Sequence, residues 1–343
     1  MKRLLVTGLA CFTGVLALTG CNGSTVNTAA DDTSSSGAAA NEEKIKIVTS
    51  IFPEYDWVKN ILGDRAEEFD VTLLCDNGTD MHSYQPSVED ITKISDSDLF
   101  IYTGGGSDEW IDDALKNAGN TGLSSLNLLD VLGDRLQEEE HTVETEEEHE
   151  AHSHDDHDTE YDEHIWLSLK NAEILCETIA DAVKNTDPEN AAQYSANAEA
   201  YSVRLKELDK KYEEAVASSA NKTLLFADRF PFLYMTNDYG IDHFAAFNGC
   251  EAETEASFDT IIFLAGKTDE LGLKNVMVID GGDRRLAETV ISNTSNKDQS
   301  ILELDSMQSV TKQDIENGLS YLSVMEKNLA VLEDALGSPQ QAQ

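Results

Sequence analysis

Cysteine is scarce in this sequence, and its spacing excludes a site built from thiols. The chain has five cysteines and no Cys-x-x-Cys pair, so it carries neither a dithiol redox motif nor a cysteine-based zinc site. Two of the five lie in or directly after the N-terminal leader described below. The other three, Cys75, Cys176 and Cys250, allow one disulfide and a free thiol. That number excludes a disulfide framework.

Positive charge is also scarce. Lys and Arg together number 24 against 66 Asp and Glu, which gives a formal net charge of −42. A surface of this sign repels nucleic acid and anionic lipid headgroups and attracts cations. We therefore expect no nucleic-acid partner.

Long apolar runs are missing after the leader, so no transmembrane helix is expected in the rest of the chain. The one run, residues 4–17, follows Lys2 and Arg3 and is too short to span a bilayer securely. It ends in Leu-Thr-Gly-Cys at 18–21, which resembles a bacterial lipobox and implies cleavage before Cys21 and lipid attachment to it. The alternative is an ordinary secretory signal with a coincidental cysteine. We predict a signal peptide over residues 1–20 and an extracytoplasmic protein anchored to the cell membrane by lipid.

The remaining chain divides by pattern into two similar halves. Residues 21–43 are rich in Ser, Thr, Ala, Gly and Asn and predict a flexible tether. Strands alternate with helices over 44–186 and again over 219–343, which is typical of parallel α/β sheets. Between them, residues 187–218 carry one apolar stripe at spacings of three and four, which predicts a helix of roughly 45 Å. The predicted fold is α/β, with two similar lobes joined by a single long rigid helix.

The expected elements can be stated by residue number. The predicted strands are 44–50, 69–75, 99–102, 223–226, 244–247, 275–279 and 301–304. The predicted helices are 55–62, one from an N-cap at Ser87, one from about Glu109, and then 187–218, 230–239, 258–271, 285–292 and 311–336. The triple glycine at 104–106 lacks the spacing of a phosphate-binding loop, so we interpret it as a turn.

An acidic, histidine-rich segment interrupts the first half. Fourteen carboxylates and no Lys or Arg lie between Glu138 and Trp166, so the segment, taken as residues 138–163, is predicted to be a solvated loop. It could be an inert linker. Imidazole and carboxylate together suit borderline divalent ions, which favours an auxiliary metal-collecting loop. Its histidines are His141, His149, His152, His154 and His157.

Outside that loop, the sequence has three histidines. His82 follows a predicted strand of the first half, and His164 lies where the acidic loop meets a helix. Ligand clefts of open α/β sheets lie at the carboxyl ends of strands, which both residues could reach. His243 lies next to an apolar strand and is expected to be a packed or surface residue.

Two motifs around these histidines resemble those of the zinc- and manganese-binding lipoproteins of bacterial ABC importers, the cluster A-I family. Residues 81–87, Met-His-Ser-Tyr-Gln-Pro-Ser, are similar to the family's His-x-Tyr-(Glu/Gln)-Pro-Ser, and residues 162–167, Asp-Glu-His-Ile-Trp-Leu, to its Asp-Pro-His-Ile-Trp-Leu. A histidine-rich acidic loop before the second motif is typical of the zinc members. The resemblance covers the chain from about residue 44. It implies a metal site in the inter-lobe cleft, with His82 and His164 from the first lobe and two ligands from the second.

The second-lobe ligands are less certain from the motifs. At the position where the family carries His or Glu, gapless counting places Arg229, whose guanidinium cannot bind a cation. Asp228, one residue earlier, is either a metal ligand or a residue hydrogen-bonded within its own loop. Asp305 ends a predicted strand where the family places Asp, Glu or His, and is the predicted fourth ligand. Asp280 and Asp283 are weaker candidates.

These features predict a monomeric, extracytoplasmic solute-binding lipoprotein that delivers Zn(II) to the permease of an ABC importer. Two imidazoles with carboxylates also suit Mn(II), so a manganese-binding protein of the same family is the main alternative. A zinc-dependent hydrolase, with Glu163 or Glu255 as base, would need a motif such as His-Glu-x-x-His, which the sequence lacks. We therefore expect no enzyme. A surface adhesin is a third alternative.

Overall fold

The computed structural model describes residues 44–139, 160–247, 249 and 256–337. The predicted signal peptide, Cys21, the tether, Cys250 and all five loop histidines lie outside these residues, so those assignments stay predictions. Within the described ranges, the helices are all too short or too polar to cross a membrane.

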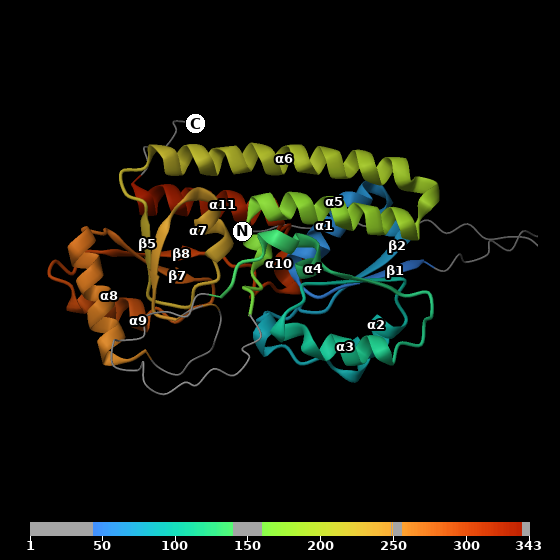
Figure 1. The fold of residues 1–343 in the computed structure, drawn as a ribbon, viewed down its shortest axis with the longest axis horizontal. Helices are drawn as coiled ribbons and strands as arrows, with labels where there is room; N and C mark the ends of the chain where they lie inside the picture. The colour runs from blue at the N-terminus through green and yellow to red at the C-terminus, as the bar shows by residue number, and fades with distance from the viewer. Residues whose placement is uncertain (1–43, 140–159, 248, 250–255, 338–343) are drawn as a thin grey trace, which may run out of the picture. The chain divides into compact units, whose positions relative to one another are not determined.

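The first lobe is built on a four-stranded parallel sheet in the order β2-β1-β3-β4 (Figure 1). Its strands are β1 (Ile45–Thr49), β2 (Phe69–Leu73), β3 (Leu99–Tyr102) and β4 (Ser124–Asn127), and its helices are α1 (Phe52–Leu62), α2 (Val88–Ser95), α3 (Glu109–Lys116), α4 (Leu128–Leu132) and α5 (Leu169–Thr186). Neighbouring residues Ile47 and Val48 point to opposite faces of the sheet and join different apolar clusters. Both faces are therefore covered, as parallel sheets require.

The second lobe repeats this plan with a parallel sheet in the order β6-β5-β7-β8. Its strands are β5 (Thr223–Phe226), β6 (Asp242–Ala245), β7 (Asn275–Ile279) and β8 (Ser300–Leu304), and its helices are α7 (Leu233–Tyr239), α8 (Phe258–Leu271), α9 (Arg285–Asn293), α10 (Lys312–Glu316) and α11 (Tyr321–Leu336). The predicted α/β class and paired sheets are confirmed.

The long helix α6 (Ala191–Ser218) runs along both lobes (Figure 1). Near its start, the Asn197 side-chain amide donates to the carbonyl of Ile61 at the end of α1, at 2.9 Å. Near its end, the Tyr212 hydroxyl donates to the carbonyl of Met325 in α11, at 2.7 Å. The helix is therefore fixed to an element of each lobe, which confirms the predicted strut.

One apolar core continues from lobe to lobe beneath this helix. A single cluster of buried side chains includes Ile47 and Trp57 of the first lobe, Leu205 of α6, and Phe226 and Tyr321 of the second. Two smaller clusters lie on the outer faces, beneath α2 and α3 in one lobe and beneath α8 and α9 in the other. The lobes are thus joined by buried apolar surface as well as by one helix.

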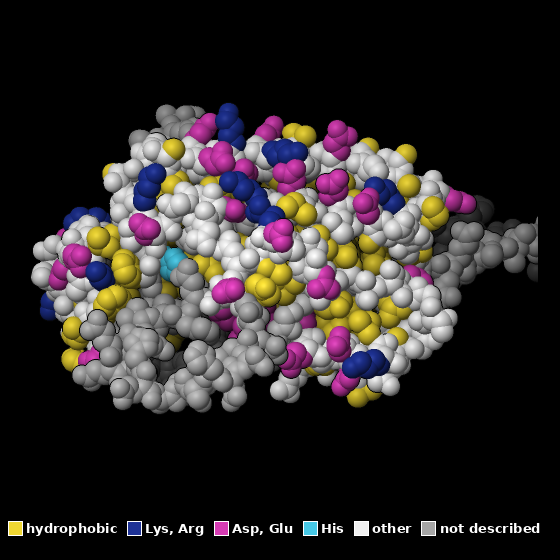
Figure 2. All heavy atoms as spheres, in the orientation of Figure 1, with side chains coloured by type: hydrophobic (Ala, Val, Ile, Leu, Met, Phe, Trp, Pro, Cys, Tyr) yellow, Lys and Arg dark blue, Asp and Glu magenta, His cyan; other side chains and the backbone are white. Residues whose placement is uncertain are grey.

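Charge on the surface is interspersed. Figure 2 shows acidic and basic side chains alternating along the face that carries α6. Some are paired between helices, for example Lys206 of α6 with Glu173 of α5 at 2.7 Å, and Lys170 of α5 with Glu213 of α6 at 3.3 Å. Pairs as exposed as these contribute little to stability.

Several sequence predictions differ from the structure in detail. The strand predicted at 244–247 is β6, Asp242–Ala245, and the helix predicted at 230–239 begins at Leu233. The predicted helix 311–336 is two helices, because Gly318 has φ +91°, outside helical geometry, and Ser320 caps a new helix by accepting the amide of Ser323. The strand β4 was missed because Ser-Ser-Leu-Asn carries little apolar signal. It forms by pairing with the edge of β3.

A buried carboxylate at the start of α1 gives a stability prediction. Glu54 is fully buried and accepts the amides of Ser50 and Ile51 and the hydroxyl of Thr103, at 2.8, 3.2 and 3.1 Å. Burial, and then the charge of Asp108, raises its pKa from 4.5 to about 8. Between these values the folded chain holds a proton that the unfolded chain releases, so rising pH favours unfolding.

We therefore expect the stability of the wild type, relative to the uncharged Glu54→Gln variant, to fall as pH rises from about 4.5 to about 8. Urea unfolding of both metal-free proteins at several pH values measures this difference. Parallel stability curves for the two proteins would contradict the assignment.

Candidate metal centre

The two motif histidines lie in loops of the first lobe. His82 belongs to a one-turn 3-10 helix, Met81–Ser83, and the side chain of Asp80 caps that turn by accepting the amide of His82 at 3.0 Å. His164 precedes a second 3-10 turn, Ile165–Leu167, which leads into α5. The turn that contains His82 lies in the connection that follows β2, at the carboxyl side of the sheet, where ligand sites of such folds are found.

The Nε2 atoms of His82 and His164 face each other at 3.1 Å. Two imidazole nitrogens bound to one zinc ion at 2.0–2.1 Å, with a tetrahedral angle between them, would lie about 3.3 Å apart. The observed separation is close to this distance. His164 is 2% exposed and the His82 side chain 23% exposed, so the pair is reached from one side only. The structure therefore brings together half of the predicted ligand set.

Acceptors stand behind both rings. The Nδ1 of His164 lies 3.2 Å from Oδ1 of Asp162, which is itself buried. The Nδ1 of His82 lies 2.6 Å from the hydroxyl of Ser107 and 3.6 Å from Oε2 of Glu163. Acceptors of this kind hold the ring proton on Nδ1 and leave Nε2 for a metal ion.

The second-lobe residue Asp228 is held by backbone. Its Oδ2 accepts the amide of Ile279 at 3.2 Å and its Oδ1 that of Arg229 at 2.9 Å. Burial raises its pKa. The sequence left two alternatives for Asp228, a metal ligand or a residue hydrogen-bonded within its own loop. These two hydrogen bonds correspond to the second alternative.

Arg229 takes a different place. Its guanidinium donates to Oδ2 of Asp80 in the first lobe at 2.9 Å. Because Oδ1 of Asp80 accepts the amide of His82, this one carboxylate joins the second lobe to the histidine turn. Arg229, which counting along the sequence places at the third-ligand position, is therefore an inter-lobe ion-pair partner.

Asp305 follows β8 and is half-buried. Its Oδ1 accepts the amide of Met307 at 2.8 Å. Burial, and then the nearby charge of Asp280, raises its pKa to about 6. Asp280 accepts both the amide and the hydroxyl of Ser306, at 2.5 and 2.6 Å. Asp283 is exposed and pairs with Arg285.

The four predicted ligands are not gathered at one point. In the part of the chain that the structure describes, no three His, Cys, Asp or Glu side chains are placed to hold a common metal ion. His82 and His164 are together, whereas Asp228 and Asp305 do not complete a group with them. Their assignment as ligands stays a prediction.

Other sequence expectations can be placed. His243 stacks on Phe230, with ring centroids 3.9 Å apart, so it is a packed residue as expected. The glycines at 104 and 105 form a turn with φ of +91° and +89°. A Cβ on Gly105 would collide with the carboxylate of Glu163, so the turn needs glycine where it passes that side chain.

Three contacts of the site were not anticipated from the sequence. They are the hydroxyl of Ser107 on His82, the Arg229–Asp80 ion pair, and the carboxylate of Glu163 behind His82. Ser107 could have been found, because it directly follows the glycine turn at the carboxyl end of β3. The ion pair joins residues 149 positions apart and leaves no local signal.

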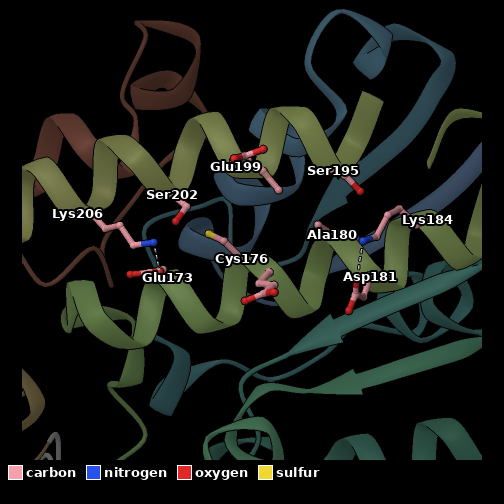
Figure 3. A pocket seen from close by; sticks show the side chains of 11 residues that line it. Glu173, Cys176, Ala180, Asp181, Lys184, Ser195, Glu199, Ser202 and Lys206 are labelled. Atoms are coloured by element: carbon pink, nitrogen blue, oxygen red, sulfur yellow. Dashed lines mark ion pairs between the residues drawn. The ribbon is translucent and has the colours of Figure 1, made fainter. Parts of the chain in front are cut away.

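A separate groove of about 340 Å³ lies between α5 and α6. Figure 3 shows its lining, with Cys176 at the floor and the pairs Lys206–Glu173 and Lys184–Asp181 at the rim. Neither motif histidine lines it. We assign it no role.

Comparison with known proteins decides the family. The family model described as "Zinc-uptake complex component A periplasmic" matches residues 47–335. The chain belongs to this family. Its members are components of zinc uptake rather than enzymes.

Individual members show how closely the family relates to this chain. Zinc-binding protein AdcA of Streptococcus pyogenes is 30% identical over 303 residues, which cover 85% of this chain and 56% of AdcA. The chain thus spans little more than half of that relative. High-affinity zinc uptake system protein ZnuA of Bacillus subtilis is 29% identical over 312 residues, covering 90% and 93%. The crystal structure of the Zn(II)-bound ZnuA-like domain of Streptococcus pneumoniae AdcA superposes with a TM-score of 0.67 at 26% identity, covering 86% and 99%.

The inter-lobe ion pair gives a second prediction. In a double-mutant cycle with Arg229→Ala and Asp80→Asn, we expect a coupling of about 1 kcal/mol in the free energy of unfolding, because both side chains are largely buried. Asparagine keeps an oxygen for the amide of His82. Chemical denaturation of the four metal-free proteins measures the coupling.

The pair Arg284–Glu303 is 3.0 Å apart, against 2.9 Å for Arg229–Asp80, but about half exposed. It is the matched control and should show a smaller coupling. Equal coupling in the two cycles would show that Arg229 does not tie the lobes together.

Proposed function

We propose that this protein captures Zn²⁺ between its two lobes and delivers it to the membrane components of an ABC importer. The main support is the pair of imidazole rings of His82 and His164. Their Nε2 atoms lie 3.1 Å apart, and each ring has an acceptor next to its Nδ1. Family membership supports zinc uptake as the process. Two imidazoles with carboxylates suit both zinc and manganese, and the general order of affinities favours zinc.

The two histidines are the first ligands in this proposal. Both come from the first lobe, so they hold the ion before any second-lobe group contacts it. Backbone amides donate to both carboxylate oxygens of Asp228 but to only one oxygen of Asp305. Asp305 therefore has an oxygen left for a metal ion and is the better candidate for a second-lobe ligand. Asp305 would complete the shell by a small shift of the loop after β8.

The acidic loop is proposed to collect metal at the entrance of the site. Its stem is described: the amide of Glu139 donates to the carbonyl of Glu160 at 3.0 Å, and that of Asp162 to the carbonyl of Gln137 at 2.9 Å. His164 lies two residues beyond this stem. Ions held by the loop would therefore be released next to the histidine pair. We further propose that lipid on Cys21 anchors a monomeric protein to the membrane that carries the permease.

Removing either motif histidine tests the site. His82→Ala and His164→Ala should each lower zinc affinity by more than the roughly 10- to 100-fold that loss of an outer-shell partner costs. Competition with a chelator measures the affinity of the metal-stripped protein.

The control for loss of an imidazole is His243→Ala, because that ring stacks on Phe230 instead of facing His82 or His164. Zinc affinity that is unchanged in both site variants would refute the proposed function.

Shortening the acidic loop tests its role. Residues 140–159 are replaced by Asn-Gly, which closes an antiparallel stem with a two-residue turn. We expect one tight zinc site to survive, weaker zinc binding to disappear, and Mn²⁺ to compete poorly for the tight site. Titration of the metal-stripped mature chain with both ions measures this.

The control keeps the loop length and replaces its five histidines by asparagine, which separates imidazole from carboxylate binding. If tight zinc binding is lost with the loop, the histidine pair is not the main site. If Mn²⁺ holds the tight site, the protein is a manganese carrier.

A further inference from the structure

Glu163 stands at the histidine pair in an unusual electrostatic position. The residue is 9% exposed. Its Oε1 accepts the amide of Ser107 at 2.9 Å, whereas its Oε2 has no hydrogen-bond partner among the described residues. That oxygen lies 3.6 Å from Nδ1 of His82. Burying a carboxylate oxygen without a donor is costly, so the arrangement calls for a partner that carries a proton or positive charge.

The only ring atom near this carboxylate for which a contact is described is Nδ1 of His82. A carboxylate accepts and never donates when ionised. The Ser107 hydroxyl, 2.6 Å from the same nitrogen, accepts when Nδ1 carries the proton. Nε2 of His164, 3.1 Å from Nε2 of His82, would accept a proton placed there, so the two tautomers of neutral His82 compete. The acceptors on the Nδ1 side favour the Nδ1–H form, in which the lone pair of Nε2 is free for a metal ion.

Glu163 also fixes the loop that carries Ser107. The bond from the Ser107 amide to Oε1 joins the turn after β3 to the residue before His164. The close approach of Gly105 to the same carboxylate leaves that turn little freedom. One side chain therefore connects the segments that hold the two metal-facing rings.

The negative charge of Glu163 can be related to the Arg229–Asp80 ion pair on the second-lobe side of the site. The second lobe places Arg229 on Asp80 next to the His82 turn, so the negative charge of Asp80 is already paired. A paired carboxylate attracts a divalent ion less than a free one does. A carboxylate behind His82 offsets this loss and makes the imidazole a stronger ligand.

We propose that Glu163 is the positioning residue of this zinc site, selecting the Nδ1–H form of His82 through its carboxylate and through Ser107. The proposal rests on the proposed function, because it takes His82 as a zinc ligand through Nε2. Glu163 acts through His82 and is not itself assigned as a ligand.

The Glu163→Gln variant separates charge and proton acceptance from packing. Glutamine keeps the shape and one oxygen for the Ser107 amide, but it presents an NH₂ donor toward Nδ1 of His82. That donor favours the Nε2–H form, which cannot bind metal. We expect zinc affinity, measured by chelator competition, to fall about 10- to 100-fold. Glu207→Gln, the same change at an exposed position of α6, should have no effect.

The tautomer of His82 gives a readout that a structural role would not change. Nitrogen-15 NMR of the metal-free, histidine-labelled protein should show the His82 proton on Nδ1 in the wild type and shifted toward Nε2 in Glu163→Gln. If the glutamine variant does not fold, Ser107→Ala removes one acceptor while keeping the charge, and should lower affinity less but in the same direction.

The outcomes separate this inference from the proposed function. If His82→Ala loses zinc while Glu163→Gln binds within twofold of the wild type and keeps the Nδ1 proton, the positioning role is wrong and the site stands. If His82→Ala retains zinc affinity, the proposed function itself fails. Loss of affinity in Glu163→Gln together with the tautomer shift supports the inference.

Discussion

The continuous apolar core between the lobes is the constraint on which the rest of the structure depends. Buried polar contacts reinforce it: the indole of Trp166 donates to the carbonyl of Ser306 at 2.9 Å, and the hydroxyl of Tyr321 donates to the carbonyl of Trp166 at 2.7 Å. Opening the lobes as hinged bodies would expose this core and leave those groups unpaired. In the proposed function, metal capture would therefore proceed by movements of loops and side chains. Trp166, whose ring contacts that of His164, holds the loop after β8 through the carbonyl of Ser306.

Four carboxylates are buried in the first lobe, in or beside the loops that hold the histidine pair. Burial raises the pKa of Glu54 to about 8 and that of Asp108 to about 7, and Glu163 and Asp162 are also buried. Amides and hydroxyls satisfy many of their oxygens, and among the described residues none of the four forms an ion pair with Lys or Arg. A site of this kind is unfavourable when empty and gains when a divalent cation enters. The stability that the large apolar core provides offsets the unfavourable free energy of burying these carboxylates.

Much of this architecture follows from patterns that are local in the sequence. The strand 99–102 and the helix 258–271 were predicted to the residue, because apolar periodicity reports directly on the backbone. His82 and His164 were found from their motifs. The break at Gly318 was missed because the apolar spacing continues through it. The contact of Arg229 with Asp80 depends on how the two lobes pack against each other, and no local sequence pattern predicts that packing.

The Arg229–Asp80 ion pair bears on how the two lobes cooperate. In a site with ligands from both lobes, the metal ion itself draws the lobes together, so closure and binding are one event. Here the Arg229–Asp80 pair already joins them, at the carboxylate that caps the His82 turn. Part of the inter-lobe attraction is then present before metal arrives, and less of the binding energy is needed to order the site. The same pair leaves fewer lone pairs for the ion, which favours release. In the proposed role the protein must both bind its ion and release it, and an ion pair between the lobes shifts that balance toward release.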